Sequence, residues 1–318
     1  MTFLHTDHWV WDFWLADDGE EFHLYYLHAP RSLGDPDLRH RNARIGHATS
    51  RDLRAWRDHG EVLGPGAPGD FDETATWTGS VVRGDDGLWR MFYTGSVFTT
   101  PDGIENVETI GVAVSEDLAT WTKRGPVLRA AGPWYETLAD GTWREEAWRD
   151  PWVYRAGGAW HMLVTARAAV GDPADRGVVG HATSPDLETW TLRAPRSDPG
   201  AGFLHLEVPQ FAEVAGREVL LFSCDTPHLA GARAASGETG GIYALPVDAA
   251  RRFPIADAVR LVDERFYSGR AVRARDGSWV LLAFENTGVD GDFVGRLSDP
   301  LPLRWAGDTL IADEETPA

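Results

Sequence analysis

The sequence predicts an all-β protein, a five-bladed β-propeller with about four antiparallel strands in each blade. The first observation is a phrase of apolar strand, glycine turn and second apolar strand, which occurs five times in the 318 residues. The copies follow one another at intervals of about 60 to 70 residues, which leaves room for four strands per copy. Their turn glycines are Gly19, Gly87, Gly158, Gly216 and Gly277. The second observation is that no long stretch has helical periodicity.

A third strand follows each hairpin and supplies another repeated phrase. Close copies that end on Ser-x-Asp-Leu-x-x-Trp occupy 45–56, 110–121 and 179–190, and a weaker copy occupies 294–305. We interpret "GGIYALPVD" around Gly241 as the eroded equivalent in the fourth unit. The Ser and Asp side chains are typical of a tight turn into the outer strand. The tryptophans are expected to pack between neighbouring blades because of their large apolar area; they are Trp56, Trp121, Trp190 and Trp305.

Five blades account for essentially the whole chain. We therefore expect one propeller domain over 1–318, without a C-terminal β-sandwich. The longer connections are polar or rich in Gly, Pro and Asp, and we expect them to surround the mouth of the central channel. They lie at 30–44, 64–76, 98–108, 129–147 and 226–240.

Composition argues against several classes of partner. With 49 acidic and 30 basic residues, the net charge is −19, whereas a nucleic acid or an anionic membrane would favour a basic face. We expect neither partner, and the sequence does not indicate an oligomeric state. The first residues lack the pattern of a secretory leader, so we expect a cytoplasmic protein. The single cysteine, Cys224, lies in an apolar strand and is expected to be a buried, inert thiol.

Three carboxylates near the start of first strands carry the functional prediction. Asp12 lies in "WVWDFW", Asp150 in "AWRDPW" and Glu207 in "HLEVPQF". A lone carboxylate among bulky apolar residues is costly to desolvate, so it is usually paired or exposed in a pocket. The innermost strands of a propeller line one channel, so three blades can direct three acids at one point. Cleavage of a glycosidic bond needs two carboxyl groups that flank it.

Four motifs in phase with the repeat resemble glycoside hydrolase families 68 and 32, the families of levansucrases and invertases. "VWDFW" is similar to the nucleophile motif of family 68, and "WTGS" at 77–80 to a second-blade segment of both families. "WRDP" at 148–151 resembles their shared Arg-Asp-Pro motif, and "RFYSG" at 265–269 a fifth-blade segment of family 32. The resemblance spans all five blades in the right order.

The resemblance implies a role for each matching residue. Asp12 matches the nucleophile, Asp150 the transition-state stabiliser, and Glu207 the general acid/base, whose pKa an apolar pocket would raise above that of a free glutamate. Candidate sugar-binding residues are Trp11, Trp77, Ser80, Arg149 and Tyr267. The implied activity is retaining hydrolysis of β-fructofuranosides of the sucrose or fructo-oligosaccharide type. Fructosyl transfer to sugar acceptors is a further activity that the resemblance allows, and no cofactor is implied.

Two alternative functions stay open at this stage. One is an inverting arabinan- or xylan-type hydrolase of the related family 43, and the other is a non-catalytic propeller that binds a carbohydrate or a protein partner. The general acid also has alternatives in Glu145 and Glu146, although we interpret these as part of a solvated, charged loop. We expect no metal, because His8, His28, His205 and His228 do not have the spacing of metal ligands.

Overall fold

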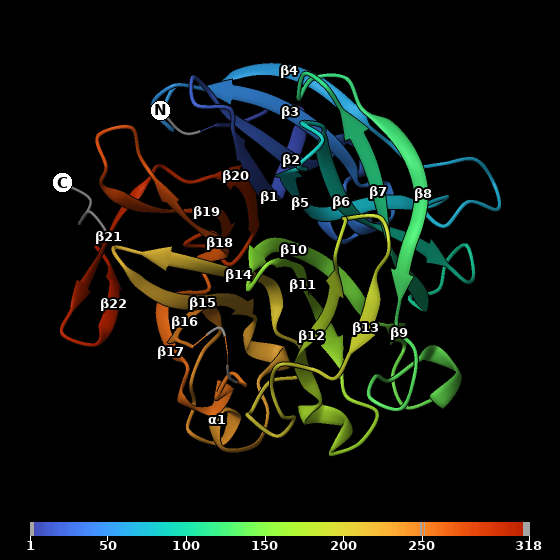
Figure 1. Cartoon of the computed structure of the whole chain (residues 1–318). Helices are drawn as coiled ribbons and strands as arrows, with labels where there is room; N and C mark the ends of the chain where they lie inside the picture. The colour runs from blue at the N-terminus through green and yellow to red at the C-terminus, as the bar shows by residue number, and fades with distance from the viewer. Residues whose placement is uncertain (1–2, 249, 251, 314–318) are drawn as a thin grey trace.

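The computed structural model describes residues 3–248, 250 and 252–313, and it has five antiparallel sheets arranged around a common centre (Figure 1). The predicted five-bladed propeller is confirmed. The first strand of each sheet is innermost, and these five strands contact one another around the centre. The five predicted turn glycines join the first two strands of each blade with φ between 80° and 96°, a conformation that side chains other than glycine rarely adopt.

The first two blades follow the predicted order of strands. Blade 1 has β1 (His8–Asp17), β2 (Phe22–Pro30), β3 (Arg44–Ser50) and β4 (Arg57–Leu63). Blade 2 has β5 (Ala75–Arg83), β6 (Trp89–Phe98), β7 (Asn106–Ser115) and β8 (Thr122–Arg129). A short additional strand, β9 (Glu145–Glu146), pairs in parallel with β7 at the start of that strand.

The other three blades complete the circle. Blade 3 has β10 (Trp148–Ala156), β11 (Ala159–Arg167), β12 (Gly177–Ser184) and β13 (Thr191–Arg193). Blade 4 has β14 (Glu207–Val214), β15 (Arg217–Cys224), β16 (Gly241–Pro246) and β17 (Val259–Asp263). Blade 5 has β18 (Phe266–Arg273), β19 (Trp279–Thr287), β20 (Phe293–Leu297), β21 (Leu301–Ala306) and β22 (Thr309–Ala312). The segment around Gly241 is a third strand, as predicted, whereas in blade 5 both β20 and β21 pair with β19.

Helices in the described residues are short and lie in the connections. The single α-helix is α1 (Gly231–Ala235), and the 3₁₀ helices are η1 (Arg31–Leu33), η2 (Pro36–Asn42), η3 (Leu138–Asp140), η4 (Pro173–Asp175), η5 (Thr226–His228) and η6 (Ile255–Asp257). None of the helices in the described part of the chain is long and apolar enough to cross a lipid bilayer. Cys224, at the end of β15, is buried, as predicted.

The repeated tryptophans pack against the preceding blade. The Trp121 ring meets Tyr25 of blade 1 edge to face at 5.5 Å, and the Trp190 ring meets Phe92 of blade 2 in the same way at 5.3 Å. The Trp305 Nε1 donates to the backbone oxygen of Val214 in blade 4 at 2.8 Å. Trp56 packs against a cluster that includes buried leucines of blade 5. The prediction that these tryptophans join neighbouring blades is confirmed.

We expect Trp121→Ala to lower the free energy of unfolding by about 3 kcal/mol, because the change leaves a void between blades 1 and 2. The activity of the folded protein should be nearly unchanged, since Trp121 does not line the pocket. Chemical denaturation measures the effect, and Trp134→Ala is the matched control because Trp134 is an exposed tryptophan. Equal stability of the two variants would contradict the packing role.

Four of the five long connections contribute residues to the central pocket. The segment 64–76 differs from the expectation because it does not line the pocket. Its Asp72 is buried, where it accepts hydrogen bonds from Tyr93 and Lys123 at 2.8 and 2.6 Å. Phe71 packs against the core between blades 1 and 2. This connection therefore stabilises the interior of the first two blades.

Candidate active site

Every innermost strand carries a β-bulge close to the central pocket. The pairing register with the second strand shifts there, so that one or two residues of the first strand are left outside the ladder. A bulge interrupts the alternation of side chains and directs one of them differently. The bulges begin at Asp12, Thr78, Asp150, Val208 and Ser268. The last three have φ of 59°, 51° and 53°, which is unusual for a β-branched residue such as Val208.

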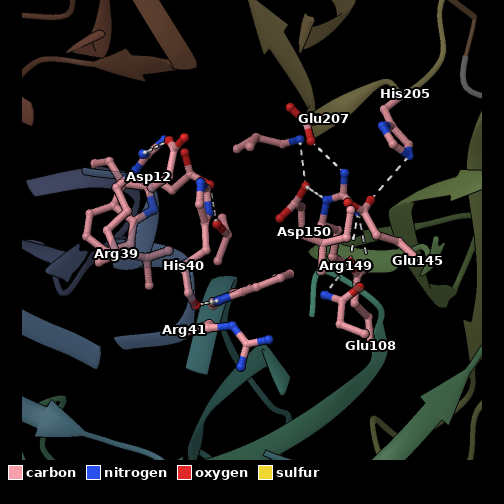
Figure 2. Close-up of a pocket in the computed structure, with 18 of the residues that line it drawn as sticks. Asp12, Arg39, His40, Arg41, Glu108, Glu145, Arg149, Asp150, His205 and Glu207 are labelled. Carbon is pink, nitrogen blue, oxygen red and sulfur yellow. Dashed lines mark hydrogen bonds and ion pairs between the residues drawn. The ribbon is translucent and has the colours of Figure 1, made fainter. Parts of the chain in front are cut away.

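The bulges open into a cavity of about 610 Å³, a size typical of small-molecule sites. Asp12, Asp150 and Glu207 all line it, although they come from blades 1, 3 and 4. Figure 2 shows Asp12 on one side of the pocket and Asp150 with Glu207 on the other. The structure thus brings together the three carboxylates that the sequence singled out.

Asp12 is held by two hydroxyl groups from the neighbouring blades. The Thr78 Oγ1 donates to one carboxylate oxygen at 2.6 Å, and the Ser268 hydroxyl donates to the other. Burial raises the pKa of Asp12, the two hydroxyl donors oppose the rise, and the charge of Glu207 adds to it. The two hydroxyl groups therefore fix the orientation of the carboxylate.

Asp150 is buried and rigidly bonded. One carboxylate oxygen accepts from Thr165 Oγ1 at 2.7 Å and from the backbone N–H of Val208 at 3.0 Å. Burial raises the pKa of Asp150 to about 6, although Arg149 lowers it, and the charges of Asp12 and Glu207 contribute to the rise. The group therefore links blades 3 and 4 and presents its other oxygen toward the pocket that it lines.

Glu207 is held by a cation and a phenol. The Arg149 Nη2 donates to its Oε1 at 2.6 Å, and the Tyr267 hydroxyl donates to its Oε2. Burial by itself would raise the pKa of Glu207, but Arg149 and Tyr267 outweigh it, so the pKa lies below the ordinary value. The expectation of a raised pKa is therefore wrong, because a cation and a phenol surround this carboxylate.

Glu108, on β7, is a member of the site that the sequence analysis missed. Its side chain has no exposed surface, and its Oε1 accepts from Arg149 Nη1 at 2.9 Å. Its Oε2 accepts from the backbone N–H of Trp148 at 2.8 Å. Burial raises the pKa of Glu108, and Arg149 opposes the rise. The signal was present as a single carboxylate within the apolar strand "NVETIGVAV".

The predicted sugar-binding residues differ in their positions. Trp11, Trp77, Arg149 and Tyr267 line the pocket, where each precedes the bulge of its strand. Ser80 does not line the pocket: it is buried, and its hydroxyl accepts a hydrogen bond from the backbone N–H of Val153. This expectation is corrected, because the bulge in "WTGS" turns Thr78, not Ser80, toward Asp12.

Two of the connections, 30–44 and 98–108, meet at the pocket beside Asp12. From η2, Arg39 lies over the rings of Phe293 and Trp11. Arg41 donates to the backbone oxygen of Thr100 at 2.9 Å and so ties η2 to the β6–β7 connection. Trp77 Nε1 donates to the backbone oxygen of His40 at 2.7 Å, which fixes the indole under η2. These contacts hold the wall beside Asp12 (Figure 2).

Glu145 and Glu146, the alternative candidates for the general acid, lie in different surroundings. Glu145 lines the pocket, 3.5 Å from Arg149 Nη1. Glu146 is buried away from it, where it pairs with Arg129 at 2.5 Å and accepts from the backbone N–H of Leu138. The interpretation of both as a solvated loop is therefore wrong for Glu146, which cannot reach a ligand in the pocket.

Two of the four histidines considered in the sequence lie at the pocket. His205 and His228 line the pocket, and His205 is buried with neither ring nitrogen hydrogen-bonded in the described structure. Burial lowers the pKa of His205 well below its ordinary value, so its imidazole is neutral. Outside the pocket, the ligand atoms of His5, Asp7 and His8 lie within 4.8 Å of one another. The His5 Nε2 lies 3.2 Å from the hydroxyl of Tyr26, which itself donates to Asp58, and the His8 Nδ1 lies 3.0 Å from the Asp7 carboxylate.

The chain belongs to the family described as "Glycosyl hydrolases family 32 N-terminal domain", whose model matches residues 14–287. Among curated proteins, it is 26% identical over 294 residues to the raffinose invertase of Escherichia coli. It is also 26% identical over 305 residues to the sucrose-6-phosphate hydrolase of that species. These alignments cover 90% and 93% of this chain but 55% and 57% of the relatives. The chain thus spans a little more than half the length of these two proteins.

Solved structures share the fold. The inulosucrase from Halalkalicoccus jeotgali bound to kestose has a TM-score of 0.79 at 23% identity, with 97% of this chain and 87% of that chain covered. The sucrose-6-phosphate hydrolase from Lactobacillus gasseri has a TM-score of 0.70 at 18% identity, with 96% and 62% covered. At these identities, the likeness establishes the architecture of the propeller.

Proposed function

We propose that the protein hydrolyses β-fructofuranosides by a retaining double displacement. Asp12 is the nucleophile, Asp150 stabilises the transition state, and Glu207 is the general acid and base. The observation that carries the proposal is the convergence of these carboxylates from three blades in one pocket, with only Glu207 bonded directly to a cation and a phenol.

In the first step, the Asp12 carboxylate attacks the anomeric carbon of the fructosyl unit. The bond to the leaving oxygen breaks, and Glu207 donates its proton to that oxygen. In the second step, Glu207 removes a proton from water, the resulting oxygen attacks the anomeric carbon, and the bond to Asp12 breaks. A sugar hydroxyl in place of water would give transfer. Asp150, fixed by Thr165 and the Val208 N–H, is rigid enough to bind sugar hydroxyls through both steps.

Membership of family 32 and similarity to an invertase and to sucrose-6-phosphate hydrolases support fructosides over arabinan or xylan. The three acids in one pocket favour an enzyme over a binding propeller. The pocket suits a neutral, polyhydroxylated ligand, because its arginines are already paired or stacked on aromatic rings. We therefore propose small fructosides such as sucrose or kestose as substrates.

A product screen tests the proposal. The protein is incubated with sucrose, sucrose 6-phosphate, raffinose, kestose, inulin and levan, and with an arabinofuranoside as the comparison. Early NMR spectra identify the released sugar and its anomer, and we expect β-fructofuranose to appear first. Initial release of the α-anomer would contradict retention, and arabinose as the main product would contradict the substrate class. A pure binding role would give no product at all.

A further inference from the structure

Glu108 is placed to act on the site through Arg149. Both of its carboxylate oxygens are occupied, one by Arg149 Nη1 and the other by the backbone N–H of the preceding residue, Trp148. The side chain has no exposed surface, so a substrate does not meet it directly. Glu108 therefore holds the start of β10 against β7 of the neighbouring blade, through the Arg149 side chain and the Trp148 N–H.

The guanidinium of Arg149 transmits this constraint to Glu207. Its Nη1 bonds to Glu108 at 2.9 Å, and its Nη2 bonds to Glu207 Oε1 at 2.6 Å. Because a guanidinium is a rigid planar fork, an anchor at one nitrogen sets the direction of the other. Glu145 approaches the same Nη1 only to 3.5 Å, which is longer than a hydrogen bond. Of the two acids beside Nη1, Glu108 therefore makes the shorter contact, and it holds the guanidinium at Nη1 while Nη2 contacts Glu207.

The contacts form a line across four blades: Glu108 in blade 2, Arg149 in blade 3, Glu207 in blade 4 and Tyr267 in blade 5. A buried ion pair by itself contributes little to stability, because desolvation offsets the attraction. The pair can instead serve to orient Arg149 and, through it, Glu207. This matters because misplacement of a reacting group by about 1 Å can slow a reaction about 100-fold.

We propose that Glu108 is a positioning residue that fixes Arg149, and through it sets the orientation and proton affinity of Glu207. The inference rests on the proposed role of Glu207 as general acid and base. The other titratable groups that interact with Glu207 are Tyr267 on β18, His228 on η5, Asp12 on β1, Asp150 on β10 and Cys224 on β15. Glu108 acts on Glu207 through the guanidinium of Arg149, which contacts both carboxylates.

The test compares Glu108→Leu with Glu146→Leu. Glu146 is a suitable control because it is also buried, pairs with an arginine and accepts a backbone N–H, but lies outside the pocket. Both variants should lose thermal stability to a similar degree. We expect kcat to fall about 100-fold in Glu108→Leu alone, and Glu108→Gln, which keeps one acceptor oxygen, should recover part of the loss.

The pH profile separates positioning from a simple charge effect. If Arg149 moves away from Glu207, the pKa of Glu207 rises, and the alkaline limb of kcat/KM shifts to higher pH. If Glu108 acted only through its negative charge, its removal would leave the positive charge of Arg149 less compensated. The pKa of Glu207 would then fall, and the alkaline limb would shift to lower pH. In the Arg149→Ala background, a further change at Glu108 should alter kcat less than about twofold, because the two residues act together.

The outcomes distinguish the inference from the proposed function. Wild-type protein that releases no fructose would overturn the function and this inference together. Active wild type with an unaltered kcat in folded Glu108→Leu would overturn the inference alone, and so would a limb that moves to lower pH. Where Glu108→Leu does not fold, the limb position in Glu108→Gln decides between the same results.

Discussion

Asp12→Asn is expected to lower kcat/KM for sucrose by at least about 10⁴-fold, because the amide cannot form the covalent intermediate. Asparagine has the same size, and its oxygen can still accept a hydrogen bond from Thr78 or Ser268. The free energy of unfolding should not fall. Burial raises the pKa of Asp12, so the ionised carboxylate costs folding free energy above its ordinary pKa, and the neutral amide removes that cost.

Initial rates and thermal unfolding curves, measured on the same preparation, test this expectation. The matched control is Asp37→Asn, since Asp37 also lines the pocket but is exposed at its mouth. A large loss of melting temperature in Asp12→Asn would make Asp12 a structural acid that joins blades 1, 2 and 5. Retained turnover would remove it from the mechanism.

Glu207→Gln is expected to slow hydrolysis of sucrose by about 10²–10⁴-fold, because the leaving oxygen no longer receives a proton. A fructoside with an acidic phenol as leaving group should lose much less in the first step, since that group departs without protonation. Azide should restore turnover of this substrate, because it attacks the intermediate without a general base. The contrast between the two leaving groups is the signature of a general acid.

The pH dependence gives a second measurement on Glu207. A general acid works in its protonated form, so kcat/KM of the wild type falls as pH rises through the pKa of Glu207. Arg149 and Tyr267 hold that pKa below the ordinary value, which predicts that kcat/KM is highest at acidic pH. The alkaline limb should vanish in Glu207→Gln. A limb that persists there but vanishes in Glu145→Gln would transfer the role to Glu145.

The pattern of repeats was sufficient to predict the blades and the three acids. Apolar hairpins with glycine turns recur in phase, and each acid lies at the start of an inner strand. The repeat also predicted the role of the tryptophans. Because they recur at the same position of each unit, they were expected to pack between blades. Such inferences are local, because strand alternation and turn chemistry depend on neighbours in the chain.

What the repeats could not predict is the chemical environment of each acid. The bulge in β5 decides that Thr78 and not Ser80 meets Asp12, and a shift of one residue reverses the face of a strand. Glu108 reaches Arg149 only because β7 and β10 lie side by side in neighbouring blades.

By itself, the sequence determined the all-β propeller, its five blades and the carboxylates at the start of three inner strands. The tertiary structure alone decided that Glu207 lies between Arg149 and Tyr267, which reverses the expected direction of its pKa shift. The physical reason is distance: a pKa responds to charges and hydrogen bonds within a few ångströms, and these partners come from blades 3 and 5, remote from Glu207 in the chain.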